Sequence, residues 1–197
     1  MEFKATGYTL VCFADKHKFE DTGWSLADPG CEKPSLIRAE YEEKQYTPRE
    51  DLEGLYRYAG WLPVQRTLKG SCAPVTYKST ALASELGLEN LYITFSGWWP
   101  KMGARMSTGS FKETEAYSVC GRLSADNKKT LVVASAGNTA RAFAKVCSEN
   151  NIPLLISIPE DNINALWFTE PLNDCVKIIA SPKGSDYFDA IALADKV

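Results

Sequence analysis

Lys112 and the turn Ser135–Thr139 carry the residue types in this chain that are best placed to do chemistry. Lys112 ends the run Ser107-Thr108-Gly109-Ser110-Phe111-Lys112, and the turn begins twenty-three residues after it. A lysine amine attacks a carbonyl carbon only when it is unprotonated, whereas a free lysine has a pKa of about 10.4. If Lys112 forms a covalent adduct, its surroundings must therefore disfavour the ammonium form.

The residues around Lys112 predict the start of a helix. Ser110 and Glu113 fit a capping box, with Ser110 as the N-cap and Glu113 reaching back to the N-cap amide. This pattern predicts a helix over 110–124 with Lys112 in its first turn, where the positive helix end and partial burial favour a neutral amine. Gly109 would let a flat ring approach the backbone. The alternative is an exposed first-turn lysine without a chemical role.

The turn Ser135-Ala136-Gly137-Asn138-Thr139 follows a predicted strand over 130–134 and precedes a predicted helix over 139–149. Backbone N–H groups at the carboxyl end of a parallel strand form an anion cradle, and ligands of such sheets bind there. The alternative is a small-residue turn capped by Asn138 or Thr139.

The second half of the chain alternates short apolar strands with amphipathic helices. Such an alternation predicts an α/β fold, with a parallel sheet covered by helices on both faces. The predicted strands are 91–95, 130–134, 153–158 and 176–180, and the predicted helices are 80–86, 110–124, 139–149 and 187–196.

The first 45 residues differ in pattern from the rest. Tyr8-Thr9-Leu10-Val11-Cys12 alternates like a strand, and Trp24-Ser25-Leu26 is expected to pair back on it as a hairpin. We therefore predict a small β arm over 1–45 and a main catalytic region over 46–197, which we expect to be cut at its carboxyl end.

Composition excludes several functional classes. The chain has 197 residues, 45% of them hydrophobic, and a formal net charge of -3 with acids and bases intermixed. No basic patch for nucleic acid or an anionic membrane is expected. The sequence also lacks a membrane-spanning run and a signal peptide, which favours the cytoplasm. Six cysteines without a close CxxC pair indicate free thiols in a reducing compartment.

The order of the two motifs, StGSFKE and then SaGNTaRAFA, resembles the threonine synthase and cysteate synthase family over nearly the whole chain. These are pyridoxal-phosphate enzymes of the tryptophan synthase β-like fold, of which this chain would hold an incomplete, amino-terminal part. Further segments look like the cysteate synthase branch: Leu36–Tyr41, Trp61–Val64, Pro74–Ser79 and Phe95–Gly97.

The resemblance implies roles for individual residues. Lys112 would form the internal aldimine with pyridoxal 5'-phosphate and move the α-proton of the substrate. Asn138 would hydrogen-bond the phenolic oxygen of the cofactor. The substrate carboxylate would be held by Ser135, Ala136, Gly137 and Thr139. Lys101 and Arg105, just upstream of Lys112, are candidate cations for an anionic leaving group and an anionic nucleophile.

The family implies a β-replacement in which sulfite displaces phosphate from O-phospho-L-serine to give L-cysteate, a precursor of coenzyme M in methanogens. Two alternatives stay open: a threonine synthase acting on O-phosphohomoserine, and a non-catalytic remnant. The resemblance also implies a homo-oligomer of the full-length protein, with small-molecule substrates and neither nucleic acid nor membrane as partner. Since Gly184 is the only glycine after residue 137, no glycine-rich phosphate loop follows Asn138, and we expect weak cofactor binding by this chain alone.

The β arm carries the residues that bear on a metal site. Relatives often begin with a ribbon that holds a CxxC knuckle, but here Asp15 stands where the second cysteine after Cys12 is expected. Structural zinc sites favour thiolates and imidazoles, so we expect no metal. A mixed site of Cys12, Asp15, His17 and Cys31 stays the alternative.

Overall fold

The computed structural model describes residues 3–33 and 35–197. The chain forms two compact units. One comprises residues up to Ser71 together with Tyr117–Lys129, and the other comprises Cys72–Ala116 together with Thr130–Val197. Helix α2 (Lys112–Arg122) has its first turn in the second unit and its remainder in the first.

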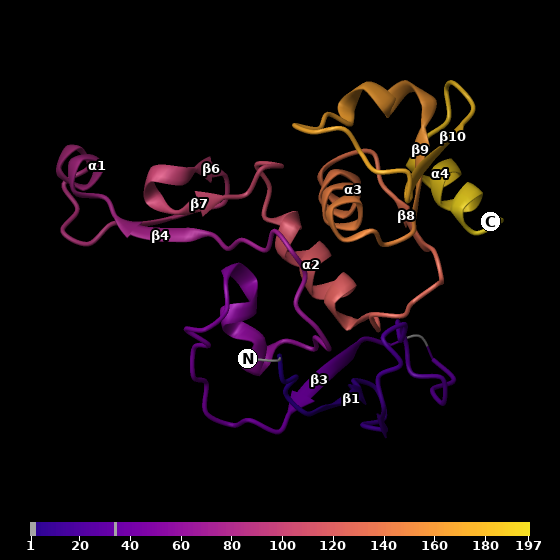
Figure 1. Ribbon diagram of the computed structural model, residues 1–197, viewed down its shortest axis with the longest axis horizontal. Helices are drawn as coiled ribbons and strands as arrows, with labels where there is room; N and C mark the ends of the chain where they lie inside the picture. The colour runs from indigo at the N-terminus through magenta and orange to yellow at the C-terminus, as the bar shows by residue number, and fades with distance from the viewer. Residues whose placement is uncertain (1–2, 34) are drawn as a thin grey trace. The chain divides into compact units, whose positions relative to one another are not determined.

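A parallel sheet organises the unit that contains Lys112. Its strands are β8 (Leu131–Ala134), β9 (Leu154–Pro159) and β10 (Val176–Ser181), in the order β10-β9-β8. Helices α3 (Asn138–Asn150) and α4 (Tyr187–Ala194) lie on opposite sides of it (Figure 1). The predicted α/β class with a parallel sheet is therefore confirmed.

Alternate side chains of β9 make the core on the two faces of this sheet. Ile156 and Ile158 are fully buried, and burying such a side chain contributes roughly 1.5–3 kcal/mol. On the other face the hydroxyl of Ser157 donates to the carbonyl of Ala190 in α4 at 2.6 Å. The apolar face of α3 consists of small and aromatic residues, all buried: Ala140, Phe143, Ala144 and Cys147. This packing fixes the amino end of α3 directly after β8.

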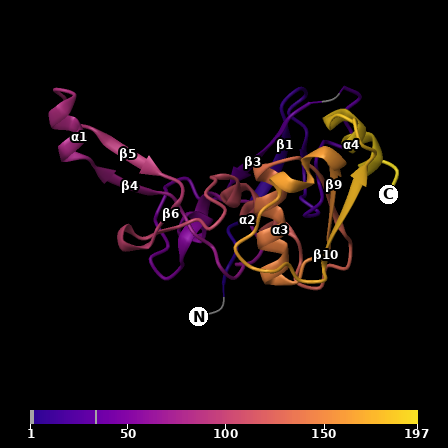
Figure 2. The ribbon, with the colours of Figure 1, turned by 90° about the horizontal axis from the view of Figure 1, so that it is seen from above.

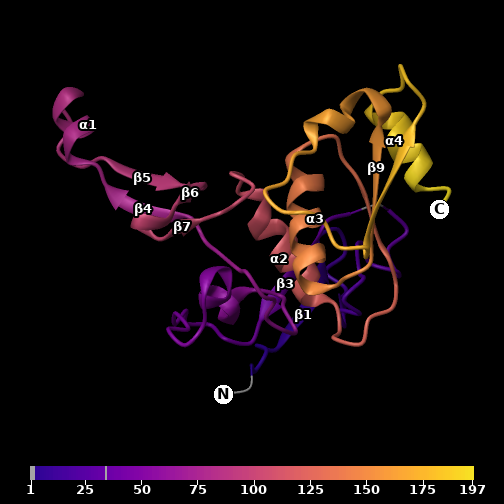
Figure 3. The ribbon, with the colours of Figure 1, turned by 45° about the horizontal axis from the view of Figure 1, so that its top comes forward.

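The other part of this unit is built from short antiparallel pairs (Figures 2 and 3). The predicted helix and strand appear as α1 (Thr80–Glu85) and β5 (Tyr92–Phe95), and Gly87 follows α1 with a φ of 66°. Three strands in this part of the unit were not predicted. Strand β4 (Val75–Lys78) pairs with β5. Strand β6 (Trp98–Trp99) pairs with β7 (Ala104–Arg105), and the 3-10 helix η2 (Pro100–Met102) connects the two.

The other unit contains the antiparallel sheet β2-β1-β3. The predicted strand β1 (Tyr8–Cys12) pairs with β2 (Lys18–Phe19) on one edge and β3 (Ile37–Tyr41) on the other. The expected hairpin between β1 and Trp24–Leu26 is therefore wrong. Lys16, with a φ of 64°, reverses the chain so early that β2 already occupies that edge.

Two packing interactions hold the rest of this unit. The 3-10 helix η1 (Gly54–Trp61) buries Tyr56, whose hydroxyl donates to the carbonyl of Tyr117 at 3.2 Å. Arg122, in α2, forms two hydrogen bonds of 2.8 Å with the carboxylate of Asp21. A further 3-10 helix, η3 (Glu160–Ala165), follows β9. Among the described residues, no helix has both the length and the apolar character needed to cross a bilayer.

Candidate functional site

Lys112 is the first residue of α2, two residues later than the predicted helix start. Its amine lies 2.5 Å from Oε2 of Glu115, one turn along the same helix, and 5.7 Å from the ring centroid of Phe111. The side chain is 33% exposed. In this conformation the amine is paired on its own helix, and among the described residues it forms no hydrogen bond or ion pair with the turn Ser135–Thr139.

Glu113 does not complete the predicted capping box. Its carboxylate accepts the backbone N–H of Thr108 at 2.6 Å, not that of Ser110. The hydroxyl of Ser110 accepts the N–H of Lys112 at 3.2 Å, as a capping side chain does. Because the helix begins only at Lys112, the carboxylate turns inward, where Glu113 is fully buried.

The buried carboxylate of Glu113 has two further partners. The Nζ of Lys145, in α3, lies 3.4 Å away, and the thiol of Cys72 donates to it at 3.3 Å. Burial and the nearby Glu113 charge raise the pKa of the Cys72 thiol to about 12. Three segments that are distant in sequence thus meet at one charge.

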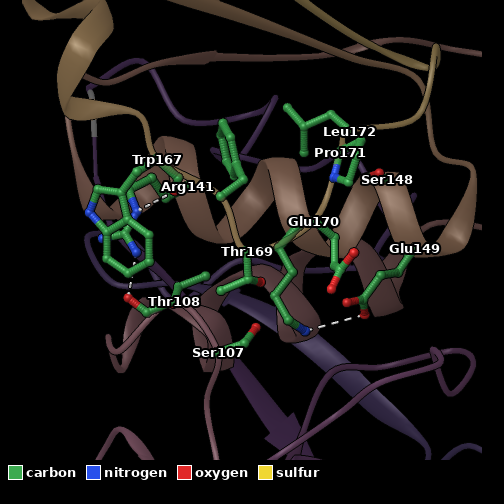
Figure 4. Close-up of a pocket in the computed structure, with 12 residues that line it drawn as sticks. Ser107, Thr108, Arg141, Ser148, Glu149, Trp167, Thr169, Glu170, Pro171 and Leu172 are labelled. Carbon is green, nitrogen blue, oxygen red and sulfur yellow. Dashed lines mark hydrogen bonds and ion pairs between the residues drawn. The ribbon is translucent and has the colours of Figure 1, made fainter.

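Arg141 connects the two segments that the sequence singled out. One of its N–H groups donates to the carbonyl of Thr108 at 2.7 Å, and another donates to Oδ1 of Asn138 at 3.2 Å. A third donates to the backbone carbonyl of Trp167, and the guanidinium carbon lies 3.4 Å from the centroid of the Trp167 ring (Figure 4). Sequence reasoning missed Arg141. The only local signal was an arginine in the first turn of the predicted helix, between Ala140 and Ala142 and next to the turn at 135–139.

The turn after β8 is in part internally satisfied. The hydroxyl of Ser135 accepts the N–H groups of Gly137 and Ala140, each at 3.3 Å. Across residues 3–33 and 35–197, the N–H groups of Ala136, Asn138 and Thr139 have no acceptor. Three of the N–H groups that were predicted to form an anion cradle are therefore free, which is fewer than expected. Neither the Gly137 amide nor the Ser135 oxygen is free.

Gly109 and Gly137 both border open space. No heavy atom lies within 4 Å of the position that a Cβ would take at either residue. At Gly137 the φ of -160° lies outside the left-handed region. At Gly109 the φ of 66° lies in the left-handed region that favours glycine. Each glycine leaves room for a ligand beside the backbone.

Lys101 and Arg105 are exposed, in η2 and β7. In the described part of the chain neither forms an ion pair, and the ion-pair partner of Lys112 is Glu115. Trp98 and Trp99, which lie between β5 and Lys101 in the sequence, differ in how they pack. Trp98 is 60% exposed, whereas Trp99 packs edge-on against Tyr77 and Phe95.

A cavity of about 120 Å³ adjoins the segment before Lys112 (Figure 4). Its walls come from the segment before α2, from α3 and from the segment after η3, and they carry two positive and two negative side chains. The lining residues are Ser107, Thr108, Arg141, Lys145, Ser148, Glu149 and residues 167–172. Lys112 and Ser135–Thr139 do not line it. It is therefore separate from the predicted site residues.

The residues present suit a flat, anionic carbonyl cofactor. Lys112 would provide the amine for a carbonyl carbon, and no heavy atom of the chain lies within 4 Å of a Cβ at Gly109 or Gly137, where a planar ring would approach the backbone. The free N–H groups of the turn are donors for an oxygen anion at the amino end of a helix of 13 residues. This donor set fits pyridoxal phosphate.

Comparison with known proteins also points to pyridoxal phosphate. A family model described as "Pyridoxal-phosphate dependent enzyme" matches residues 77–190, which include Lys112 and the turn at 135–139. No solved structure matches the chain significantly.

Curated relatives carry the name cysteate synthase. That of Methanocella paludicola is 43% identical over 192 residues, covering 96% of this chain and 44% of the relative. The Methanosarcina acetivorans protein is 47% identical over 163 residues, covering 83% of this chain and 39% of the relative. The Methanothrix thermoacetophila protein is 49% identical over 164 residues. The chain thus spans less than half the length of these relatives, and by its family match it belongs to the pyridoxal-phosphate dependent enzymes.

Proposed function

We propose that the protein catalyses a pyridoxal-phosphate-dependent β-replacement, in which O-phospho-L-serine and sulfite give L-cysteate and phosphate. The observation that carries the proposal is the Arg141 bridge, which joins the segment before Lys112 to Asn138. The curated relatives named cysteate synthase supply the choice of reaction.

Lys112 is proposed to hold the cofactor and to move the proton at the substrate Cα. The bound cofactor supplies the electron sink that makes this proton acidic. To act, the amine must leave Glu115 and turn toward the open space beside Gly109. The ion pair that it gives up is half-exposed, and such pairs contribute only about 0.2–1 kcal/mol.

Asn138 is proposed to orient the cofactor ring. Its Oδ1 accepts from Arg141, and a guanidinium has only donors to offer, so the amide NH2 is the group left to face outward. An outward NH2 would donate a hydrogen bond to the phenolic oxygen of the cofactor. Arg141 therefore selects which end of the Asn138 side chain meets the ring.

The turn is proposed to bind the substrate carboxylate through the N–H groups of Ala136 and Thr139 and the Thr139 hydroxyl. The hydroxyl of Ser135 is bound to the amides of Gly137 and Ala140, so we assign it to shaping the turn. Lys101 and Arg105 remain the proposed cations for the leaving phosphate and the incoming sulfite.

The test uses protein expressed from the full reading frame, with pyridoxal phosphate, O-phosphoserine and sulfite. We expect phosphate and cysteate in equal amounts, measured by a colorimetric assay and by chromatography. Lys112→Ala should lower the rate by about 10²–10⁴-fold or more, because the proton has no other carrier in place. Lys183→Ala, at an exposed lysine before α4, is the matched control.

The same assay separates the competing functions. Turnover of O-phosphohomoserine to threonine, without reaction of phosphoserine, would assign the threonine synthase reaction instead. Absence of turnover, combined with no borohydride-fixed cofactor on Lys112, would leave a non-catalytic member of the family.

Two further properties belong to the proposal. All six cysteines are free, which fits the reducing cytoplasm that we propose as the location. The homo-oligomer expected for the full protein stays a prediction. Light scattering on the peak that elutes from size-exclusion chromatography would check it.

A further inference from the structure

Cys12, Asp15 and Cys31 converge on one point at the edge of the antiparallel sheet. One ligand atom from each, a thiol sulfur or a carboxylate oxygen, lies within 4.8 Å of the others. Cys12 is buried, Cys31 is half-buried and Asp15 is exposed, so the group opens to solvent on one side. Nothing in the proposed reaction uses these residues.

Backbone hydrogen bonds place Cys12 and Asp15 together. Cys12 ends β1, its N–H donates to the carbonyl of His17 at 3.0 Å, and its carbonyl accepts the N–H of Lys16 at 3.1 Å. The left-handed φ of 64° at Lys16 closes this tight reversal. The carboxylate of Asp15 accepts the N–H of His17 at 3.0 Å, which turns it toward the Cys12 side of the loop.

The loop that carries Cys31 is held by a buried carboxylate. The side chain of Asp28 is 1% exposed and accepts the N–H of Gly30 at 2.8 Å, while the Asp28 carbonyl accepts the N–H of Cys31. Nδ1 of His17 lies 2.9 Å from the same carboxylate. His17, which the sequence placed among the candidate ligands, is thus not one of the three converging residues. It ties the Cys31 loop to the β1–β2 turn.

We propose that Cys12, Asp15 and Cys31 bind a thiophilic divalent cation of the Zn²⁺ class, with a water molecule at the fourth position. Two thiolates and one carboxylate form a donor set that zinc accepts. Two sulfurs about 2.3 Å from a tetrahedral ion lie about 3.8 Å apart, within the separation found here. The ion would join the β1–β2 turn to the loop before β3. Cys12 and Cys31 are both free thiols, as this role requires.

The test is metal titration of the full-length protein, stripped with a chelator under reducing conditions. Cobalt(II) should give a thiolate-to-metal charge-transfer band, and zinc should remove the band at one equivalent per chain. Cys31→Ser, at a half-buried position that tolerates a hydroxyl, should abolish the band. Cys175→Ser, at a half-buried thiol in the other unit, should leave it unchanged.

The carboxylate and its support need separate variants. Asp15→Ala should weaken zinc binding and keep the band, whereas Asp15→Cys should strengthen both, because a third sulfur joins the site. His17→Gln should weaken binding by about 10–100-fold through the Asp28 loop. A Cys12–Cys31 disulfide in the freshly isolated protein, or a cobalt band unaffected by Cys31→Ser, would overturn the proposal. Unchanged zinc affinity in Asp15→Ala would remove Asp15 from it.

Discussion

The carboxylate of Glu113 accepts the backbone N–H of Thr108 at 2.6 Å, inside the unit and away from solvent. The backbone carbonyl of Thr108 accepts a hydrogen bond from the guanidinium of Arg141. Both backbone polar groups of Thr108 are therefore fixed by buried charges. Because Thr108 lies four residues before Lys112, this arrangement helps to set where α2 begins and therefore where Lys112 lies.

Removing the Glu113 charge should destabilise the fold. Glu113→Ala leaves the Thr108 N–H buried without an acceptor and takes one partner from Lys145, which keeps Glu149. We expect a loss of about 1–3 kcal/mol in the free energy of unfolding, measured by urea titration. Glu85→Ala, at an exposed glutamate of α1, should stay within about 0.5 kcal/mol. Equal effects of the two variants would show that the Thr108 contact contributes nothing.

Arg141→Lys should weaken cofactor binding. A lysine cannot reach the carbonyl of Thr108, the side chain of Asn138 and the ring of Trp167 at once, because it lacks the planar fork. We expect the affinity for pyridoxal phosphate, measured by absorbance titration, to fall at least about tenfold, or about 1.4 kcal/mol. The other arginine to replace as a control is Arg38, an exposed residue of β3, which should leave the affinity unchanged. Wild-type affinity in Arg141→Lys would contradict the bridge.

The pair between Asp21 and Arg122 should make stability depend on acid pH. Burial alone would raise the pKa of Asp21, but hydrogen bonds from Arg122, Tyr8 and Gly23 outweigh it and hold that pKa below its usual range. A depressed pKa stabilises the folded state above the unfolded value of about 3.9, and the contribution disappears as pH falls through the folded value.

Asp21→Asn therefore tests this linkage. We expect it to lower the free energy of unfolding by about 2–3 kcal/mol at neutral pH, and the difference from wild type to shrink below about pH 4. Denaturant titrations at a series of pH values measure both. Asp195→Asn, at the exposed end of α4, is the control. A difference that stays constant down to low pH would argue against the ionised pair.

The thiol of Cys72 should be unreactive in the folded protein. Its pKa of about 12 leaves almost no thiolate near pH 8, and only 7% of the residue is exposed. Iodoacetamide followed by mass spectrometry of the peptides should find Cys72 modified only after unfolding in urea. Modification at the same rate with and without urea would mean that the Glu113 environment is not formed in solution.

The parallel sheet was predictable because its strands are rich in apolar residues, although only β9 is buried along most of its length. Leu131–Ala134 and Leu154–Pro159 are short apolar runs, and the helix between them has one small, apolar stripe. The structure places these elements within one or two residues of the predicted bounds. By contrast, β3 and β4 contain charged and half-exposed residues, so their strand character depends on partners elsewhere in the chain.

The positions of Lys112 and of the turn at 135–139 also followed from the sequence, but the contacts around them did not. Arg141 reaches partners 33 residues before it and 26 residues after it, and no local pattern encodes such a separation. The capping pattern misled for a similar reason. The sequence shows a glutamate three residues after a serine in either case, whether its carboxylate turns back to the helix end or points inward to Lys145.

Gly137 has a consequence of a different kind. Neither a left-handed φ nor crowding by the chain itself explains a glycine there, since its φ is -160° and nothing lies within 4 Å of a Cβ. An added methyl group would thus meet no other atom of the chain within 4 Å, and a guest molecule is what it would contact. Alanine at this position separates the two effects, so any lost affinity in a normally folded variant would measure the volume that the guest occupies.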